Sequence, residues 1–257
     1  MSTVRNDEEI ELLRENALLV SRTLAEVAKH IKPEITTLEL DRLAEQFIRD
    51  HGAEPGFLGY RGFPNTLCIS VNSVVVHGIP SAYRLREGDV VSVDCGTRLK
   101  GYCGDTAYTF AVGTITPETA NLLKVTKESL YKGIEAAKAG NRVGDISNAV
   151  QNHVERFGFS VVREMVGHAV GREIHERPDV PNHGRRGNGP KLRSGMVLCI
   201  EPMINMGRKD IFQENDGWTV RTRDRKPSAH YELTVAIRNG KADVLSTFEF
   251  IEQVLKN

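Results

Sequence analysis

The chain has 257 residues, with 34 lysines and arginines against 34 aspartates and glutamates, so its formal net charge is zero. This balance argues against a general electrostatic binder of nucleic acid or membrane surfaces, because such partners reward an excess of basic residues. The length is sufficient for one sizeable core, and the 40% hydrophobic fraction excludes a disordered chain.

The cysteines and the N-terminal stretch indicate the compartment. Cys68, Cys95, Cys103 and Cys199 are scattered and form no Cys-x-x-Cys pair, which predicts free thiols in a reducing environment. The first residues turn charged at once and hold no signal-peptide core, and no stretch approaches the roughly 18 apolar residues of a membrane span. We therefore expect a soluble, cytoplasmic protein with neither a membrane nor DNA as partner.

Apolar residues spaced three and four apart predict four amphipathic helices. The first pair begins at a cap at Asn6 or Asp7, breaks at Lys32-Pro33 and ends near Gly52. The second pair covers 122–137 and 146–154, breaks at Gly140 and ends near Gly158. The common offset of 106 residues is a weak internal repeat. If real, it means similar α+β halves at 7–112 and 117–250 with the site between them. No linker or low-complexity tract divides the chain, which predicts a single domain over 1–257.

β-branched runs bounded by glycine, proline and asparagine predict the strands that follow each helix pair. These strands are 67–76, 90–94 and 106–112, then 160–166, 196–201, 218–222 and 232–237. The segments 182–193 and 224–229 are loops by composition.

Acidic residues lie at the ends of these apolar strands. Asp94 and Glu201 close two of them, and Glu232 opens a third. Asp105 joins the set if the hairpin turns symmetrically near Leu99-Lys100, because it then faces Asp94 directly with Cβ atoms about 5 Å apart. One such acid is explained by a salt bridge, but four favour a metal cluster as the counter-charge, since a buried unpaired carboxylate costs several kcal/mol.

Histidines accompany the carboxylates. His168 and His175 lie in GHAVGREIHERP after an apolar strand, and His77 lies in VVVHGIP; each alone also fits an ordinary structural role. Four carboxylates and an imidazole suit a dinuclear centre of Mn, Fe, Co or Zn, the usual platform for activating water. The sequence has no P-loop, no His-Glu-x-x-His and no Gly-x-Ser-x-Gly, so amide hydrolysis fits best.

Over essentially its whole length the chain resembles the type I methionine aminopeptidases. The motifs that carry the resemblance are SVNSVVVHGIP, VSVDCG followed by GDTAYTF, GHAVGREIHERP, IEPMI, and DGWTV with SAHYELTV. The resemblance implies the pita-bread fold, an α+β architecture in which helices cover a curved, mostly antiparallel sheet around a central dinuclear site. It also implies metal-dependent removal of the N-terminal methionine of nascent proteins when the second residue is small.

The resemblance assigns roles residue by residue. The ligands of two divalent ions (Co, Mn, Fe or Zn) would be Asp94, Asp105, His168, Glu201 and Glu232, with Asp105 and Glu232 bridging. A bridging hydroxide would attack the first peptide bond, with Glu201 as proton shuttle. His175 and His77 would steady the substrate and the tetrahedral intermediate.

The same mapping predicts two further sites. The methionine pocket would be lined by Tyr60, Phe63, Cys68 and Trp218, although core packing alone also explains Cys68. A monovalent cation would be held by oxygens of Asn72, Val74 and Ser228. Ile174 and Leu233 depart from the common family pattern, which often has an aromatic residue and a histidine there.

Two other functions are alternatives to this one. Another pita-bread metallopeptidase, an Xaa-Pro dipeptidase or aminopeptidase, usually carries a large extra N-terminal domain, whereas the first helix here begins within about ten residues of Met1. A non-catalytic binding protein of this fold would have lost ligands, and this chain keeps the set.

The sequence offers one candidate partner besides the substrate. The basic loop with Arg185, Arg186, Lys191 and Arg193 is a candidate for transient contact with ribosomal RNA, against the preferred alternative of a solvated loop. We expect a monomer, and we expect the chain's own Met1-Ser2 start to be a substrate.

Overall fold

The predicted helices are present in the computed structural model, which describes residues 4–256; Met1 and Ser2, the expected substrate sequence, lie outside these residues. Helices α1 (Asp7–Ala28) and α2 (Thr37–Asp50) form the first pair, and α3 (Pro117–Ala136) and α4 (Val143–Glu155) form the second. Capping boxes at Asn6 and Thr36 begin α1 and α2. A short fifth helix, α5 (Glu249–Leu255), was not predicted.

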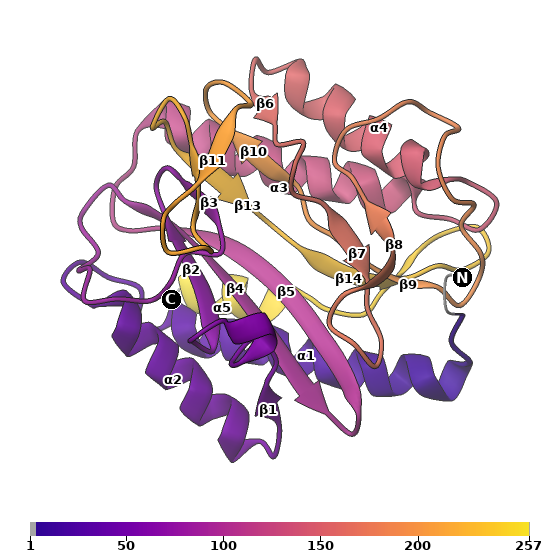
Figure 1. Ribbon diagram of the computed structural model, residues 1–257, viewed down its shortest axis with the longest axis horizontal. Helices are drawn as coiled ribbons and strands as arrows, with labels where there is room; N and C mark the ends of the chain where they lie inside the picture. The colour runs from indigo at the N-terminus through magenta and orange to yellow at the C-terminus, as the bar shows by residue number, and fades with distance from the viewer. Residues whose placement is uncertain (1–3, 257) are drawn as a thin grey trace.

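The strands lie between the two helix pairs, with α1 and α2 below them and α3 and α4 above in the view of Figure 1. One sheet has the order β1-β4-β2, with β5 also paired to β4, and a second has the order β15-β14-β9-β7-β8. Two three-stranded sheets, β13-β10-β6 and β11-β12-β3, complete the set, and the paired strands are antiparallel. The expected α+β architecture is present.

The strand bounds refine most of the predicted ones, but the strand predicted at 160–166 was wrong beyond Val161. The first five strands are β1 (Glu54–Pro55), β2 (Leu67–Val71), β3 (Val74–Val76), β4 (Val90–Leu99) and β5 (Tyr102–Ala111). The next five are β6 (Ser160–Val161), β7 (Gly167–Ala169), β8 (Glu176–Val180), β9 (Val197–Ile200) and β10 (Met203–Asn205). The last five are β11 (Ile211–Gln213), β12 (Val220–Thr222), β13 (Ser228–His230), β14 (Leu233–Ala236) and β15 (Asp243–Val244). The single strand predicted at 67–76 is broken by a turn where Asn72 has a φ of 53°.

The predicted register of the β4–β5 hairpin was wrong. Asp94 pairs with Ala107, and Asp105 pairs with Gly96. The two-residue turn is Lys100-Gly101, with φ of 51° and 77°, the pair of positive values that suits the twist of a tight hairpin. The shift is two residues, so both aspartates keep the same face and become diagonal neighbours.

The core lies between the sheets and their helices. Helix α1 packs on β4 and β5 through fully buried side chains that include Ile10, Leu13 and Leu24. Ile174 and Leu233, the two departures from the family pattern, are both 1% exposed and pack in the core. Among residues 4–256, no helix combines the length and the apolarity that crossing a bilayer requires.

Candidate metal centre

The five predicted metal ligands converge from five places in the two large sheets. Asp94 and Asp105 lie on β4 and β5, and His168 lies on β7. Glu201 directly follows β9, and Glu232 directly precedes β14. All five line one cavity of about 430 Å³. Adjacent antiparallel strands thus bring together residues that lie up to 138 positions apart, from 94 to 232.

The donor atoms are close and buried. The His168 Nε2 atom lies 3.7 Å from Asp105 Oδ2 and 3.4 Å from Glu201 Oε1. One ligand atom from each of Asp105, His168 and Glu232 fits within a cluster 4.8 Å across, together with the thiol of Cys199. The His168 Nδ1 atom lies 3.1 Å from the carbonyl oxygen of Ala169, which leaves Nε2 directed at the carboxylates.

Burial sets the electrostatics of the cluster. It is the main cause that raises the pKa values of the Asp105, Glu201 and Glu232 carboxyls well above their usual range, and neighbouring carboxylates raise them further. The pKa of Asp94 rises to about 6, again chiefly through burial. Burial lowers the pKa of the His168 imidazole to about 4, so it is neutral and able to bind a metal.

Unpartnered oxygens show that this donor set fits divalent cations. Asp94 Oδ1, Asp105 Oδ1 and Glu232 Oε1 are buried and have no hydrogen-bond partner. Buried polar atoms in native proteins are nearly always paired, so three orphan carboxylate oxygens in one cavity call for a positive charge. Oxygen donors with one imidazole are the ligands of hard or borderline divalent ions.

Cys199 is a neighbour of the cluster that sequence reasoning did not place there. It pairs with His168 across the β7–β9 ladder. Burial, reinforced by Glu232, raises the pKa of its thiol well above the usual value, so the sulfur stays protonated and is a poor ligand. All four cysteines are buried free thiols, as predicted.

The predicted catalytic histidines line the same cavity. The His175 ring lies 4.2 Å from that of His168, and its Nδ1 atom lies 3.0 Å from the Tyr60 hydroxyl. His77 faces Trp218 edge-on at 6.2 Å. Desolvation by the cavity walls lowers the pKa of His77 to about 4 and that of the more exposed His175 to about 3, so both rings are neutral N–H donors near pH 7.

The residues predicted for the methionine pocket form one wall of the cavity. Tyr60, Phe63, Cys68 and Trp218 all line it. The Phe63 and Trp218 rings meet edge to face at 5.1 Å, and the Tyr60 ring stacks on His175 at 5.2 Å. The residues predicted for the monovalent site do not line this cavity. Ser228 N donates to Asn72 O at 2.9 Å, and Val74, two residues after Asn72, begins β3. The monovalent ion itself stays a prediction.

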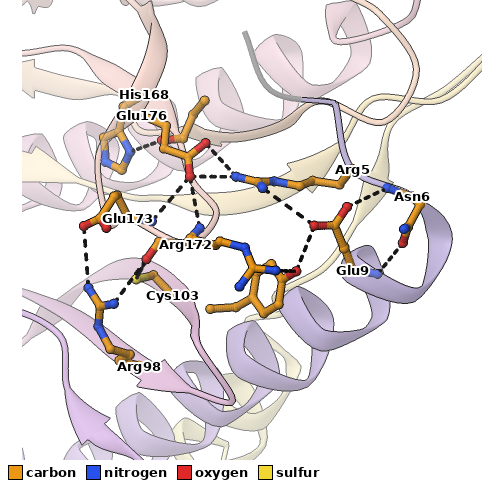
Figure 2. A network of polar contacts seen from close by, with 11 residues as sticks. Arg5, Asn6, Glu9, Arg98, Cys103, His168, Arg172, Glu173 and Glu176 are labelled. Atoms are coloured by element: carbon orange, nitrogen blue, oxygen red, sulfur yellow. Dashed lines mark hydrogen bonds and ion pairs between the residues drawn. The ribbon is translucent and has the colours of Figure 1, made fainter.

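A polar network that the sequence did not reveal holds the loop carrying His175, residues 170–175 between β7 and β8 (Figure 2). The Arg5 guanidinium donates to both carboxylate oxygens of Glu176, at 2.6 and 2.7 Å, and Arg172 N donates to the first of them at 3.0 Å. From the β4–β5 hairpin, Arg98 donates to Arg172 O at 3.2 Å. The segment before α1 and the hairpin end therefore fix this loop.

His230 is the second residue that sequence reasoning missed. It is 2% exposed, and its Nε2 atom lies 3.4 Å from Glu201 Oε2. The segment 224–229 was expected to be a loop, so a strand ending at His230 was not anticipated.

Comparison with known proteins identifies the family. The sequence model of metallopeptidase family M24 matches residues 11–239. The chain belongs to this family. A methionine aminopeptidase from Clostridium perfringens is 52% identical over 96% of this chain and 99% of its own length. The expectation from the sequence motifs is thereby confirmed, and in an M24 metallopeptidase the buried donor cluster is a divalent-metal site.

Solved structures agree with this assignment. The crystal structure of a methionine aminopeptidase from Rickettsia prowazekii matches with a TM-score of 0.95 and 38% identity, over 96% of this chain and all of that one. The match confirms the expected pita-bread fold. A prolidase from Pyrococcus furiosus shares the fold at a TM-score of 0.80 and 24% identity, but this chain covers only 66% of it. The comparisons thus favour the expected activity over the Xaa-Pro alternative.

Proposed function

We propose that this chain removes the N-terminal methionine from peptides and nascent proteins whose second residue is small. The observation that carries the proposal is one cavity that joins the carboxylate–imidazole cluster to a wall of aromatic rings and a thiol. A chain end that enters this cavity has its first peptide bond beside the cluster and its first side chain against the wall. The full-length similarity to methionine aminopeptidases supports the same substrate.

The proposed cofactor is a pair of divalent ions, Co, Mn, Fe or Zn, chosen in the cell by availability. Asp94, Asp105, His168, Glu201 and Glu232 would hold them, with Asp105 and Glu232 shared. When bound, such ions supply an activated water and polarise the carbonyl of the scissile bond.

The side chains around the cluster would perform the remaining chemistry. Glu201 ends a strand beside the cluster and has a raised pKa, so it is suited to accept a proton and pass it to the leaving amine. His175 and His77 are neutral, so they donate hydrogen bonds to the developing oxyanion without repelling the cations. The Tyr60 hydroxyl orients His175.

The pocket wall would select methionine. A thioether is polarisable and packs well against aromatic edges, which Phe63 and Trp218 provide.

The same proposal includes a monovalent cation at Asn72, Val74 and Ser228, a monomeric state and a cytoplasmic location. Arg186, in the basic loop, has an 87% exposed side chain that lies 3.7 Å from Asp145, which fits a solvated loop better than a ribosome contact.

The test uses two peptides that differ only in the second residue, Met-Ala-Ser and Met-Leu-Ser. We expect methionine to be released from Met-Ala-Ser and little from Met-Leu-Ser. A chelator should abolish this release, and adding Mn, Fe, Co or Zn should restore it. Cleavage that survives chelation, or no cleavage with any of these metals, would falsify the proposal.

A further inference from the structure

Four buried polar atoms at the metal centre have no hydrogen-bond partner, and one of them belongs to none of the proposed ligands. Three are the carboxylate oxygens of Asp94, Asp105 and Glu232; the fourth is the Nε2 atom of His230. An unpaired buried imidazole nitrogen is as unfavourable as an unpaired buried oxygen. All four lie around one cluster; a bound cation would pair with the three oxygens, and it leaves His230 Nε2 to be explained.

The position of His230 is fixed by the strand that carries Asp105. Thr109 of β5 accepts a hydrogen bond from His230 N at 2.9 Å and donates to His230 O at 2.7 Å. His230 also pairs with Met203 of β10 at the end of β13. With its backbone held on two sides and only 2% of the residue exposed, the imidazole has no solvent to which it could turn.

Glu201 lies between two imidazoles. Its Oε1 atom is 3.4 Å from His168 Nε2, and its Oε2 atom is 3.4 Å from His230 Nε2. His168 is one of the proposed metal ligands, whereas His230 is neither a proposed ligand nor a proposed catalytic residue. Each carboxylate oxygen of Glu201 therefore has one ring nitrogen as its neighbour. The His230 contact is not a hydrogen bond in this arrangement, but a small rotation of the ring would let Nε2 donate to Glu201 Oε2.

We infer that His230 is a further residue of the metal centre: it fixes the second carboxylate oxygen of Glu201 and raises the affinity for the ion that Glu201 and His168 hold. The inference rests on the proposed function in so far as these residues bind divalent ions. Groups that orient metal ligands typically change metal affinity 10- to 100-fold when they are replaced.

The experiment measures metal binding rather than catalysis. Metal-free protein is titrated with Mn²⁺ by calorimetry, and the ions per chain are counted by elemental analysis, for wild type, His230→Ala and His230→Gln. We expect His230→Ala to bind the ion at Glu201 and His168 about 10- to 100-fold less tightly, and His230→Gln, which keeps a polar group, to lose less. The control is His153→Gln, because the Nε2 atom of His153 lies 3.0 Å from Glu128, away from the cluster. This variant should bind Mn²⁺ as the wild type does.

The outcomes separate the two claims. A wild-type protein that binds no divalent ion would overturn the proposed function and this inference with it. A wild type that binds metal, with both His230 variants binding equally well, would overturn this inference alone. Should the variants fail to fold, a crystal structure of the Mn-loaded wild type decides. His230 Nε2 hydrogen-bonded to Glu201 supports the inference, and a ring that binds an ion directly or turns away from Glu201 overturns it.

Discussion

The Nη2 atom of Arg5 donates to both carboxylate oxygens of Glu176, at 2.6 and 2.7 Å, and so forms an ion pair between residues 171 positions apart. Only 6% of the Arg5 side chain and 16% of the Glu176 side chain are exposed. Glu176 directly follows His175, so the segment before α1 helps to position a proposed catalytic histidine of the other half of the chain.

Replacing Arg5 by alanine should destabilise the protein and lower its activity. The change leaves the Glu176 carboxylate largely buried without its partner, which costs about 3 kcal/mol of the free energy of unfolding. Urea denaturation measures this loss. Arg14→Ala is the matched control, since its ion pair with Asp243 is more exposed and should contribute less than about 1 kcal/mol. Equal effects of the two variants would contradict a special role for Arg5.

Gly171→Ala should act through the same ion pair. A Cβ atom at this position would lie 1.9 Å from Arg5 Nη2 and 2.5 Å from Glu176 Oε1, so these side-chain ends must move. The cost of Gly171→Ala should therefore be clearly smaller in an Arg5→Ala background than in the wild type. A double-mutant cycle measures this coupling, and strict additivity of the two changes would refute it.

Tyr60→Phe should lower kcat about fivefold with little change in KM. The variant keeps the ring that lines the pocket and stacks on His175 but loses the hydroxyl 3.0 Å from His175 Nδ1, a hydrogen bond worth about 1 kcal/mol. Steady-state kinetics on Met-Ala-Ser measures both constants. Tyr83→Phe, which loses a hydroxyl bonded to Asp89 instead, is the control. A change confined to KM would assign Tyr60 to substrate binding alone.

His77→Asn should make the stability less sensitive to acid. Burial lowers the pKa of His77 from 6.5 to about 4. Between these values the unfolded chain binds a proton that the folded chain does not, so stability falls as the pH falls through this window. The variant lacks this loss, and its free energy of unfolding should drop less than that of the wild type between pH 7 and pH 5. His51→Asn, at the exposed end of α2, serves as the control. An identical drop in wild type and His77→Asn would mean that folding does not lower the pKa of His77.

Local signals in the sequence were sufficient for the four long helices and for marking Asp94, Glu201 and Glu232 as candidate ligands. The cap at Asn6 and the spacing of Ile10 and Leu13 locate the start of α1 from a short stretch of sequence. A carboxylate such as Glu201 stands out because it directly follows an apolar strand. Both features need only neighbouring residues to be recognised. The seven residues of α5 are too few for a periodic pattern to be clear.

Long-range relationships could not be predicted in the same way. Alternation of side chains gives the face of Asp94 and Asp105, but a register shift of two residues preserves that face, so the hairpin pairing depended on locating the Lys100-Gly101 turn. The bond between Thr109 and His230 spans 121 residues and leaves no trace in the local pattern. Arg5 likewise has nothing in its own neighbourhood that indicates Glu176.

The most direct test of the account is the number of divalent ions per chain. Metal-free protein is loaded with Mn²⁺ or Co²⁺, separated from free metal and analysed, for wild type, Asp105→Asn and Glu232→Gln. Asp89→Asn is the control, since this buried carboxylate is bonded to Asn72 and Tyr83 outside the cluster. We expect two ions per chain in the wild type and the control, and fewer in the two cluster variants. A wild type that holds no ion, or cluster variants that keep both, would contradict it.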